Sequence, residues 1–156
     1  MKARIYSVLS GLVFLVAVVA APHRLQATLG ESPDSVRSDR EALSATGVVT
    51  KAHHRYTVEQ VESDSTTVRE YVSPSGVIFA VAWNGLVHQD LRQLLGSYAD
   101  EYEQALKHTP RQWDRRRLRV KANRVIVETW GHMRNLQGRA YIPALIPSGV
   151  SIHEVK

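Results

Sequence analysis

Seven consecutive apolar residues at positions 77–83 constrain the fold of this chain more than any other feature. A strand with one solvated face alternates apolar and polar side chains, whereas an uninterrupted apolar run is typical of a strand covered on both faces. Large residues such as Phe79 and Trp83 alternate here with the small Ala80 and Ala82. We therefore expect a central strand with a layer on each side, and a helix that approaches closely over the alanines.

Six segments have the composition and periodicity of β-strands, and they fall into two groups of three. Short polar turns separate members of a group, and Pro74 and Gly76 occupy positions that suit a type I turn. Strands joined by such turns pair in antiparallel fashion. The expected strands are residues 56–61, 66–72 and 77–83 in the first group, and residues 117–121, 125–130 and 138–143 in the second.

An amphipathic helix is expected between the two groups, over about 88–107, because leucine and tyrosine recur there at the spacing of helical turns. Gly96 lies inside this stripe at a cost of about 1 kcal/mol relative to alanine, which indicates a bend or a close contact with the sheet. A short helix is expected at about 33–45, because Ser32 and Pro33 suit a helix start. The pattern predicts an α+β domain: an antiparallel sheet of about six strands in two meanders, with one long amphipathic helix packed on a face and a short N-terminal helix.

The first 27 residues have the pattern of a secretory signal peptide rather than of a folded domain. Lys2 and Arg4 precede an uncharged, mostly apolar run of 17 residues at 5–21, and a polar stretch follows. This run is shorter than the roughly 20 residues that a membrane-spanning helix needs. An uncleaved N-terminal anchor is the alternative interpretation.

Cleavage of the leader is expected after Ala27, and cleavage after Ala20 or Ala21 is the alternative. The sequence thus predicts a signal peptide at 1–27 and a single α+β domain at 28–156. It predicts export, either to the periplasm or out of the cell.

Charge and cysteine content exclude several classes of function. The chain has 20 Lys or Arg against 15 Asp or Glu, but three basic residues lie in the expected leader, which leaves 17 against 15 and a net charge of +2. A nucleic-acid-binding domain is usually more basic, so no nucleic-acid partner is expected. The absence of Cys excludes disulfides, thiolate nucleophiles, Cys-ligated zinc and iron–sulfur clusters. Membrane contact is expected only through the transient leader.

Four segments of the chain, residues 69–85, 90–96, 131–134 and 138–147, carry a family resemblance. Together they resemble a family of small exported bacterial proteins, domain-of-unknown-function family 2844. The resemblance covers nearly the whole of the expected mature chain. It implies export in a Gram-negative bacterium and one compact domain, and it supplies no catalytic residues.

The fifth expected strand carries the strongest local charge. Arg117, Arg119 and Lys121 share one face of it. Such a face is either an anion site for an acidic glycan, a lipid or a membrane surface, or the solvated side of an edge strand that is protected from pairing with another chain. The edge-strand interpretation is the favoured one. Trp113 in the preceding loop is the aromatic residue least expected in the core, and it joins these three as a candidate binding residue.

No catalytic arrangement, metal site or cofactor is expected. The histidines lack the His-x-x-x-His and Glu-x-x-His spacings, and the chain has neither a Gly-x-Ser-x-Gly motif nor a glycine-rich phosphate loop. The favoured hypothesis is a non-catalytic binding or accessory module of the cell envelope, with an envelope protein or an anionic glycan or lipid as partner. The alternative is a small periplasmic hydrolase assembled from distant residues, with Glu70, His88 and His132 as acid–base groups. A structural part of a surface or secretion assembly is a third hypothesis.

Overall fold

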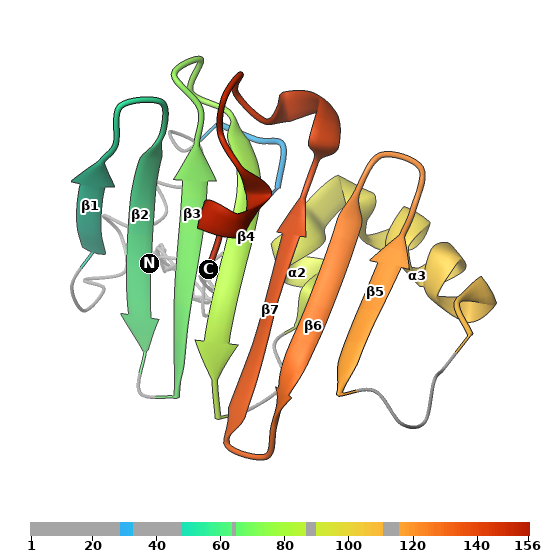
Figure 1. Ribbon diagram of the computed structural model, residues 1–156. Helices are drawn as coiled ribbons and strands as arrows, with labels where there is room; N and C mark the ends of the chain where they lie inside the picture. The colour runs from blue at the N-terminus through green and yellow to red at the C-terminus, as the bar shows by residue number, and fades with distance from the viewer. Residues whose placement is uncertain (1–28, 33–47, 64, 87–89, 111–115) are drawn as a thin grey trace, which may run out of the picture.

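One sheet of seven antiparallel strands forms the centre of the molecule (Figure 1). The computed structural model describes residues 29–32, 48–63, 65–86, 90–110 and 116–156, and the structural statements below concern these residues. The strands lie in the order β1–β2–β3–β4–β7–β6–β5. Their bounds are β1 Val48–Ala52, β2 Thr57–Ser63, β3 Thr66–Val72, β4 Ile78–Gly85, β5 Arg117–Lys121, β6 Ile126–His132 and β7 Asn135–Tyr141.

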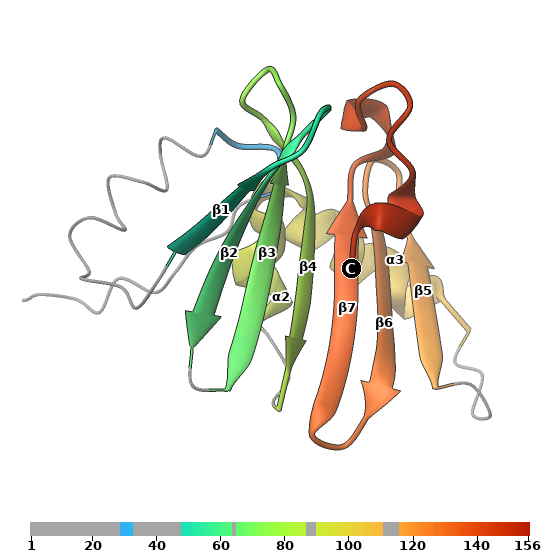
Figure 2. The ribbon, with the colours of Figure 1, turned by 60° about the vertical axis from the view of Figure 1, so that its left-hand side comes forward.

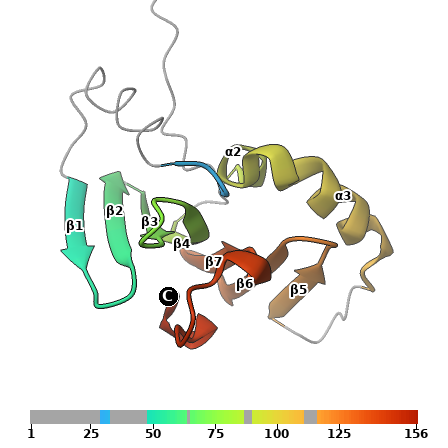
Figure 3. The same cartoon turned by 90° about the horizontal axis from the view of Figure 1, so that it is seen from above.

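Two layers cover the sheet from opposite sides (Figure 3). The helical layer lies on one side, and residues 143–156, the C-terminal segment, lie on the other. No helix among the described residues is both long and apolar enough to cross a membrane. The helical layer consists of α2 (Leu91–Leu95), a 3-10 turn (Gly96–Tyr98) and α3 (Ala99–His108), and the C-terminal segment contains 3-10 turns at Pro143–Leu145 and Ile152–Glu154.

The structure confirms the α+β class and the long helix on one face, but the predicted number of strands is wrong. The seventh strand is β1, which pairs with β2 at the edge of the sheet. Its residues 49–52 are exposed, so the sequence lacks the apolar alternation on which strand prediction depends. The predicted short helix at 33–45 and the predicted leader at 1–27 lie outside the described residues.

The long helix is divided at Gly96. Asp90 caps its start, because its carboxylate accepts a hydrogen bond from the backbone N–H of Arg92 at 3.0 Å. Gly96 has φ 52° and ψ −121°, a combination that side chains strongly disfavour. This glycine lets the helix change direction while Leu95 and Tyr102, on its two sides, both stay buried. The bend expected at this position is confirmed.

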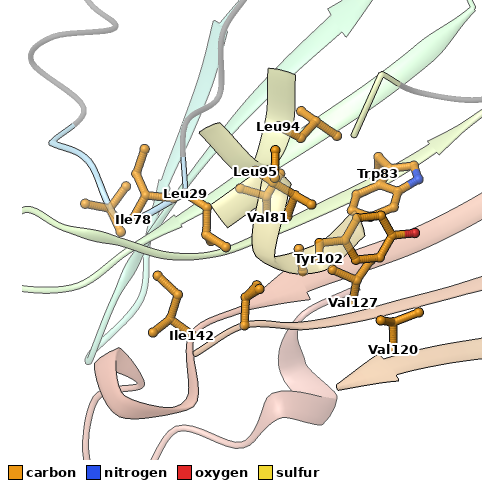
Figure 4. Close-up of a cluster of buried hydrophobic side chains, with 14 residues drawn as sticks. Leu29, Ile78, Val81, Trp83, Leu94, Leu95, Tyr102, Val120, Val127 and Ile142 are labelled. Carbon is orange, nitrogen blue, oxygen red and sulfur yellow. The ribbon is translucent and has the colours of Figure 1, made fainter. Parts of the chain in front are cut away.

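The main core lies between the sheet and the divided helix (Figure 4). Val81 and Trp83 of β4 point into it and are 0% and 5% exposed. Burying these side chains supplies most of the driving force for folding in a chain without disulfides. Other members of this cluster are Leu29, Ile78, Leu94, Leu95, Tyr102, Val120, Val127 and Ile142.

A β-bulge decides which face each residue of β4 occupies. The register between β3 and β4 shifts next to Phe79, and such an extra residue reverses the alternation beyond it. Phe79 therefore lies with Ala80 and Ala82 in a second buried cluster, beneath the C-terminal segment. The expectation that the helix approaches over the alanines is wrong, because the helix covers the side of Val81 and Trp83.

An ion pair ties α3 to the turn between β5 and β6. Glu101 accepts hydrogen bonds from the backbone N–H and from the guanidinium Nε of Arg124, the latter at 2.9 Å. Burial raises the pKa of the Glu101 carboxyl, but the hydrogen bonds and charge of Arg124 lower it more, so this pKa lies below its usual value. The contact therefore stabilises the fold above the usual pKa of the carboxyl, and its contribution is lost as the pH falls through the lowered pKa.

Candidate binding site

The C-terminal segment covers only part of the sheet face on which it lies (Figure 2). It crosses in front of β4, ends between β3 and β4, and leaves the end of the sheet nearest the β6–β7 turn uncovered (Figure 1). Val155 anchors it, because this side chain is fully buried among the aromatic residues of the second cluster. Two kinds of surface thus share one face of the sheet, an apolar part under the segment and a polar part beside it.

Arg139 of β7 fastens the C-terminal segment to the sheet. Its guanidinium donates hydrogen bonds to the carbonyl oxygens of Ile152 at 2.7 Å and Val155 at 3.1 Å. It also pairs with the carboxylate of Glu128 on β6 at 2.6 Å, and both side chains of this pair are 13% exposed. A largely desolvated, multiply hydrogen-bonded ion pair of this kind fixes the position of its partners.

Two tyrosines hold the end of the segment. The Tyr71 hydroxyl donates a hydrogen bond to the carbonyl oxygen of Lys156, and it accepts one from the Lys156 backbone N–H, both at 3.0 Å. The Tyr56 hydroxyl donates to Glu154 at 3.1 Å. Burial and then this carboxylate raise the pKa of Tyr56, whereas hydrogen bonds from the Ser151 backbone and from Tyr56 lower the pKa of Glu154.

A groove of about 800 Å³ lies on this face, between the C-terminal segment and the uncovered strands. All seven strands contribute to its lining, and so does the segment. Five Lys or Arg side chains line the groove against two Glu, so its charge is positive. The basic residues are Lys51, Arg69, Arg117, Arg139 and Lys156.

The strand register arranges the polar side chains of the groove in two rows that run across the strands. Residues paired on neighbouring antiparallel strands lie side by side on the same face. The first row, here the arginine row, contains Arg69 of β3, Ala82 of β4, Arg139 of β7, Glu128 of β6 and Arg119 of β5. The second, the amide row, contains Asn84 of β4, Gln137 of β7, Trp130 of β6 and Arg117 of β5.

Some arginines of the two rows are paired with a carboxylate and others are not. Glu128 lies between Arg139 and Arg119 and pairs with both, at 2.6 and 3.1 Å. Arg69 donates a hydrogen bond from Nε to the amide oxygen of Gln60 at 2.9 Å, which orients its guanidinium without neutralising it. Its Nη1 also donates to the side-chain oxygen of Asn84 at 3.4 Å and to the backbone oxygen of Lys156 at 3.3 Å. Within the described part of the chain, neither Arg69 nor Arg117 forms an ion pair with an Asp or Glu side chain, and Nη2 of Arg69 and the guanidinium of Arg117 make no described hydrogen bond.

Trp130 is a support for arginines rather than an open aromatic surface. The guanidinium carbons of Arg117 and Arg139 each lie 5.7 Å from the centroid of its ring, and they come from the strands on its two sides. Its indole N–H donates to the side-chain oxygen of Gln137 at 2.8 Å. The cation–π contacts and this hydrogen bond hold the amide row in place.

The structure places three of the four predicted binding residues together. Arg117, Arg119 and Lys121 are exposed on β5, on the face that carries the groove, and β5 is an edge strand as expected. Arg117 lines the groove, and Arg119 borders it through Glu128. Trp113 lies outside the described residues.

Sequence reasoning missed the other half of the site. Arg69, Glu128 and Arg139 come from three strands that are distant in sequence, and only the order and register of the sheet bring them together. A weak signal was present: Glu128 interrupts the apolar strand that begins at Val125, and a charged residue inside a buried strand usually has a partner.

The two residues of the hydrolase hypothesis that the structure describes, Glu70 and His132, are not brought together. Glu70 is 1% exposed on the side of β3 that faces the helical layer, because its neighbours Val68 and Val72 pack in the main core. His132 is exposed at the end of β6, which is separated from β3 by the two strands β4 and β7. His88 lies outside the described residues. In the described ranges, no group of three or more His, Asp or Glu residues is placed to hold a metal ion.

Comparison with known proteins gives one family. No curated protein and no solved structure gives a significant match to the chain. The sequence profile of a family described as "Protein of unknown function (DUF2844)" matches residues 25–155, which is most of the chain and includes every strand and helix described above. The chain therefore belongs to the DUF2844 family.

Proposed function

We propose that this protein is an exported, non-catalytic binding module of the cell envelope, and that it holds an anionic envelope component in the groove beside its C-terminal segment. The observation that carries the proposal is the pair of uncompensated charges on Arg69 and Arg117 in a groove with excess positive charge. A cleft lined by one sign of charge concentrates ligands of the opposite sign. The pattern at 1–27 supports export, because a charged start, an apolar run and a small-residue exit are the features of a secretory leader.

The arrangement of the site supports binding rather than catalysis. The two carboxylates of the groove, on Glu128 and Glu154, are engaged in hydrogen bonds with Arg139 and Tyr56. Both carboxylates of the groove thus have partners within the protein, which supports a site that presents cations to a ligand.

Binding to cell-envelope fragments tests this proposal. Protein recovered from the periplasm of the producing cells is expected to co-sediment with such fragments at low ionic strength and to be released by high salt, because exposed charges are screened. Arg117→Gln is expected to reduce the bound fraction at least threefold, because each phosphate or carboxylate contact to arginine is a charge-assisted hydrogen bond. Intact mass of the recovered protein reports whether residues up to 20, 21 or 27 are removed.

Lys107→Gln provides the matched control. Lys107 is exposed on α3, on the opposite side of the sheet, so this variant has the same net charge as Arg117→Gln with the groove intact. It should bind as the wild type does. Equal losses in both variants would show that net charge and not the groove governs binding, and absence of the protein from the periplasm would refute the export part of the proposal.

A further inference from the structure

The two uncompensated arginines are too far apart for one small anion. Arg69 is on β3 and Arg117 on β5, and β4, β7 and β6 lie between them. Neighbouring strands are about 4.8 Å apart, so four steps across the sheet separate the two positions by about 19 Å along its surface. A ligand that contacts both arginines is therefore an extended molecule with at least two negative charges, and it runs across the strands.

The surface between the two arginines is polar, and its charges are partly paired. Arg139 and Arg119 share the single carboxylate of Glu128 there, which leaves one positive charge in excess. Asn84 and Gln137, which face each other across β4 and β7, carry side-chain amides. Asn84 accepts a hydrogen bond from Arg69, and Gln137 accepts one from Trp130 and donates one to Asn135, so each amide keeps at least one N–H and one lone pair for a ligand. An amide offers both hydrogen-bond donors and acceptors, and such groups suit hydroxyls, which also do both. The middle of the groove thus matches a hydroxylated stretch of ligand that carries little negative charge.

Other extended anions fit this surface less well. Single-stranded nucleic acids need open aromatic faces on which bases stack, but Arg117 and Arg139 flank the ring of Trp130. Lipids need an apolar surface, but the C-terminal segment covers the apolar part of this face, including Tyr71. An extended peptide pairs along a strand edge rather than across strands.

We infer that the groove binds a linear acidic polysaccharide that lies across the strands from β3 to β5. Its carboxylates contact Arg69 and Arg117, and its hydroxyls contact Asn84 and Gln137. This inference rests on the proposed function and names the ligand class for the same site.

Isothermal calorimetry with the processed protein from the periplasm tests it. The probes are polygalacturonate, its monomer galacturonate, the neutral polymer dextran, and vesicles of phosphatidylglycerol. Polygalacturonate is expected to bind at least tenfold more tightly per site than galacturonate, because only the polymer spans both arginines. Arg117→Gln is expected to lower the affinity for polygalacturonate about tenfold, since one charge-assisted contact is lost. Lys107→Gln should leave it unchanged, and dextran should not bind.

The possible outcomes distinguish this inference from the proposed function on which it rests. Binding of the vesicles but not of polygalacturonate would overturn the glycan inference and leave an anion-binding groove. Equal affinity for galacturonate and polygalacturonate, or an affinity that Arg117→Gln does not change, would also overturn it. If none of the anionic probes and no envelope fragment binds, both statements fail. Arg117 is exposed and makes no described hydrogen bond, so Arg117→Gln removes only its contact with the ring of Trp130, and circular dichroism of the variant checks that the fold is kept.

Discussion

Replacing Arg139 with alanine is expected to lower the free energy of unfolding by about 3 kcal/mol. The substitution leaves the 13% exposed carboxylate of Glu128 with only the exposed Arg119 as a partner. It also removes the donors to the carbonyl oxygens of Ile152 and Val155, so the C-terminal segment loses its main polar anchor. Breaking a buried ion pair by removing one partner costs far more than breaking an exposed pair, because a desolvated charge stays behind. Urea-induced unfolding, followed by circular dichroism, measures the change.

Arg119→Ala is the control for this prediction. Arg119 pairs with the same carboxylate at 3.1 Å, but its side chain is 58% exposed. Exposed pairs contribute at most about 1 kcal/mol. Limited proteolysis should in addition cut residues 143–156 faster in Arg139→Ala than in Arg119→Ala. Similar stabilities of the two variants would contradict the role of Arg139 as the anchor of the segment.

Replacing Gly138 with alanine is expected to cost about 2–3 kcal/mol, although only one methyl group is added. Gly138 pairs with Trp83 across β4 and β7. A Cβ at position 138 would lie 2.3 Å from Cζ2 of the Trp83 indole and 2.9 Å from the backbone oxygen of Glu128. The indole is buried in the core and cannot move aside without leaving a void, so the strand or the ring must shift.

A double-mutant cycle with Trp83→Leu tests the cause of this cost. The smaller side chain removes the clash, so Gly138→Ala should cost at least 1 kcal/mol less in the Trp83→Leu background than in the wild type. Thermal and urea unfolding of the four proteins give the coupling energy. If the destabilisations of Gly138→Ala and Trp83→Leu were additive, the cost of Gly138→Ala would have a cause other than the clash with the indole.

Local sequence patterns predict the strands that have strong periodicity. The run at 77–83 indicates a central strand, and the alternation at 117–121 indicates β5 with its basic face and its edge position. The helix and its bend follow from the apolar stripe and from Gly96. These features are predictable because each depends on residues that are neighbours in sequence.

Features that depend on pairing between distant strands are not predictable in this way. β1 is exposed and has no alternation of its own, so only its ladder with β2 identifies it. The bulge at Phe79 reverses the faces of β4, and no local signal marks it. The arginine row requires the order β3–β4–β7–β6–β5, which places Arg69 four strands from Arg119, and the sequence contains no trace of that order.

Arginine footprinting tests the central claim, that the uncovered part of the sheet face is the binding surface. The processed protein is treated with phenylglyoxal, with and without polygalacturonate, and the modification of each arginine is measured by mass spectrometry. We predict that the ligand protects Arg69 and Arg117, whereas Arg92 on the helical side, which is 63% exposed, reacts equally in both samples. Equal protection on both sides of the sheet, or protection of Arg92 alone, would contradict this account.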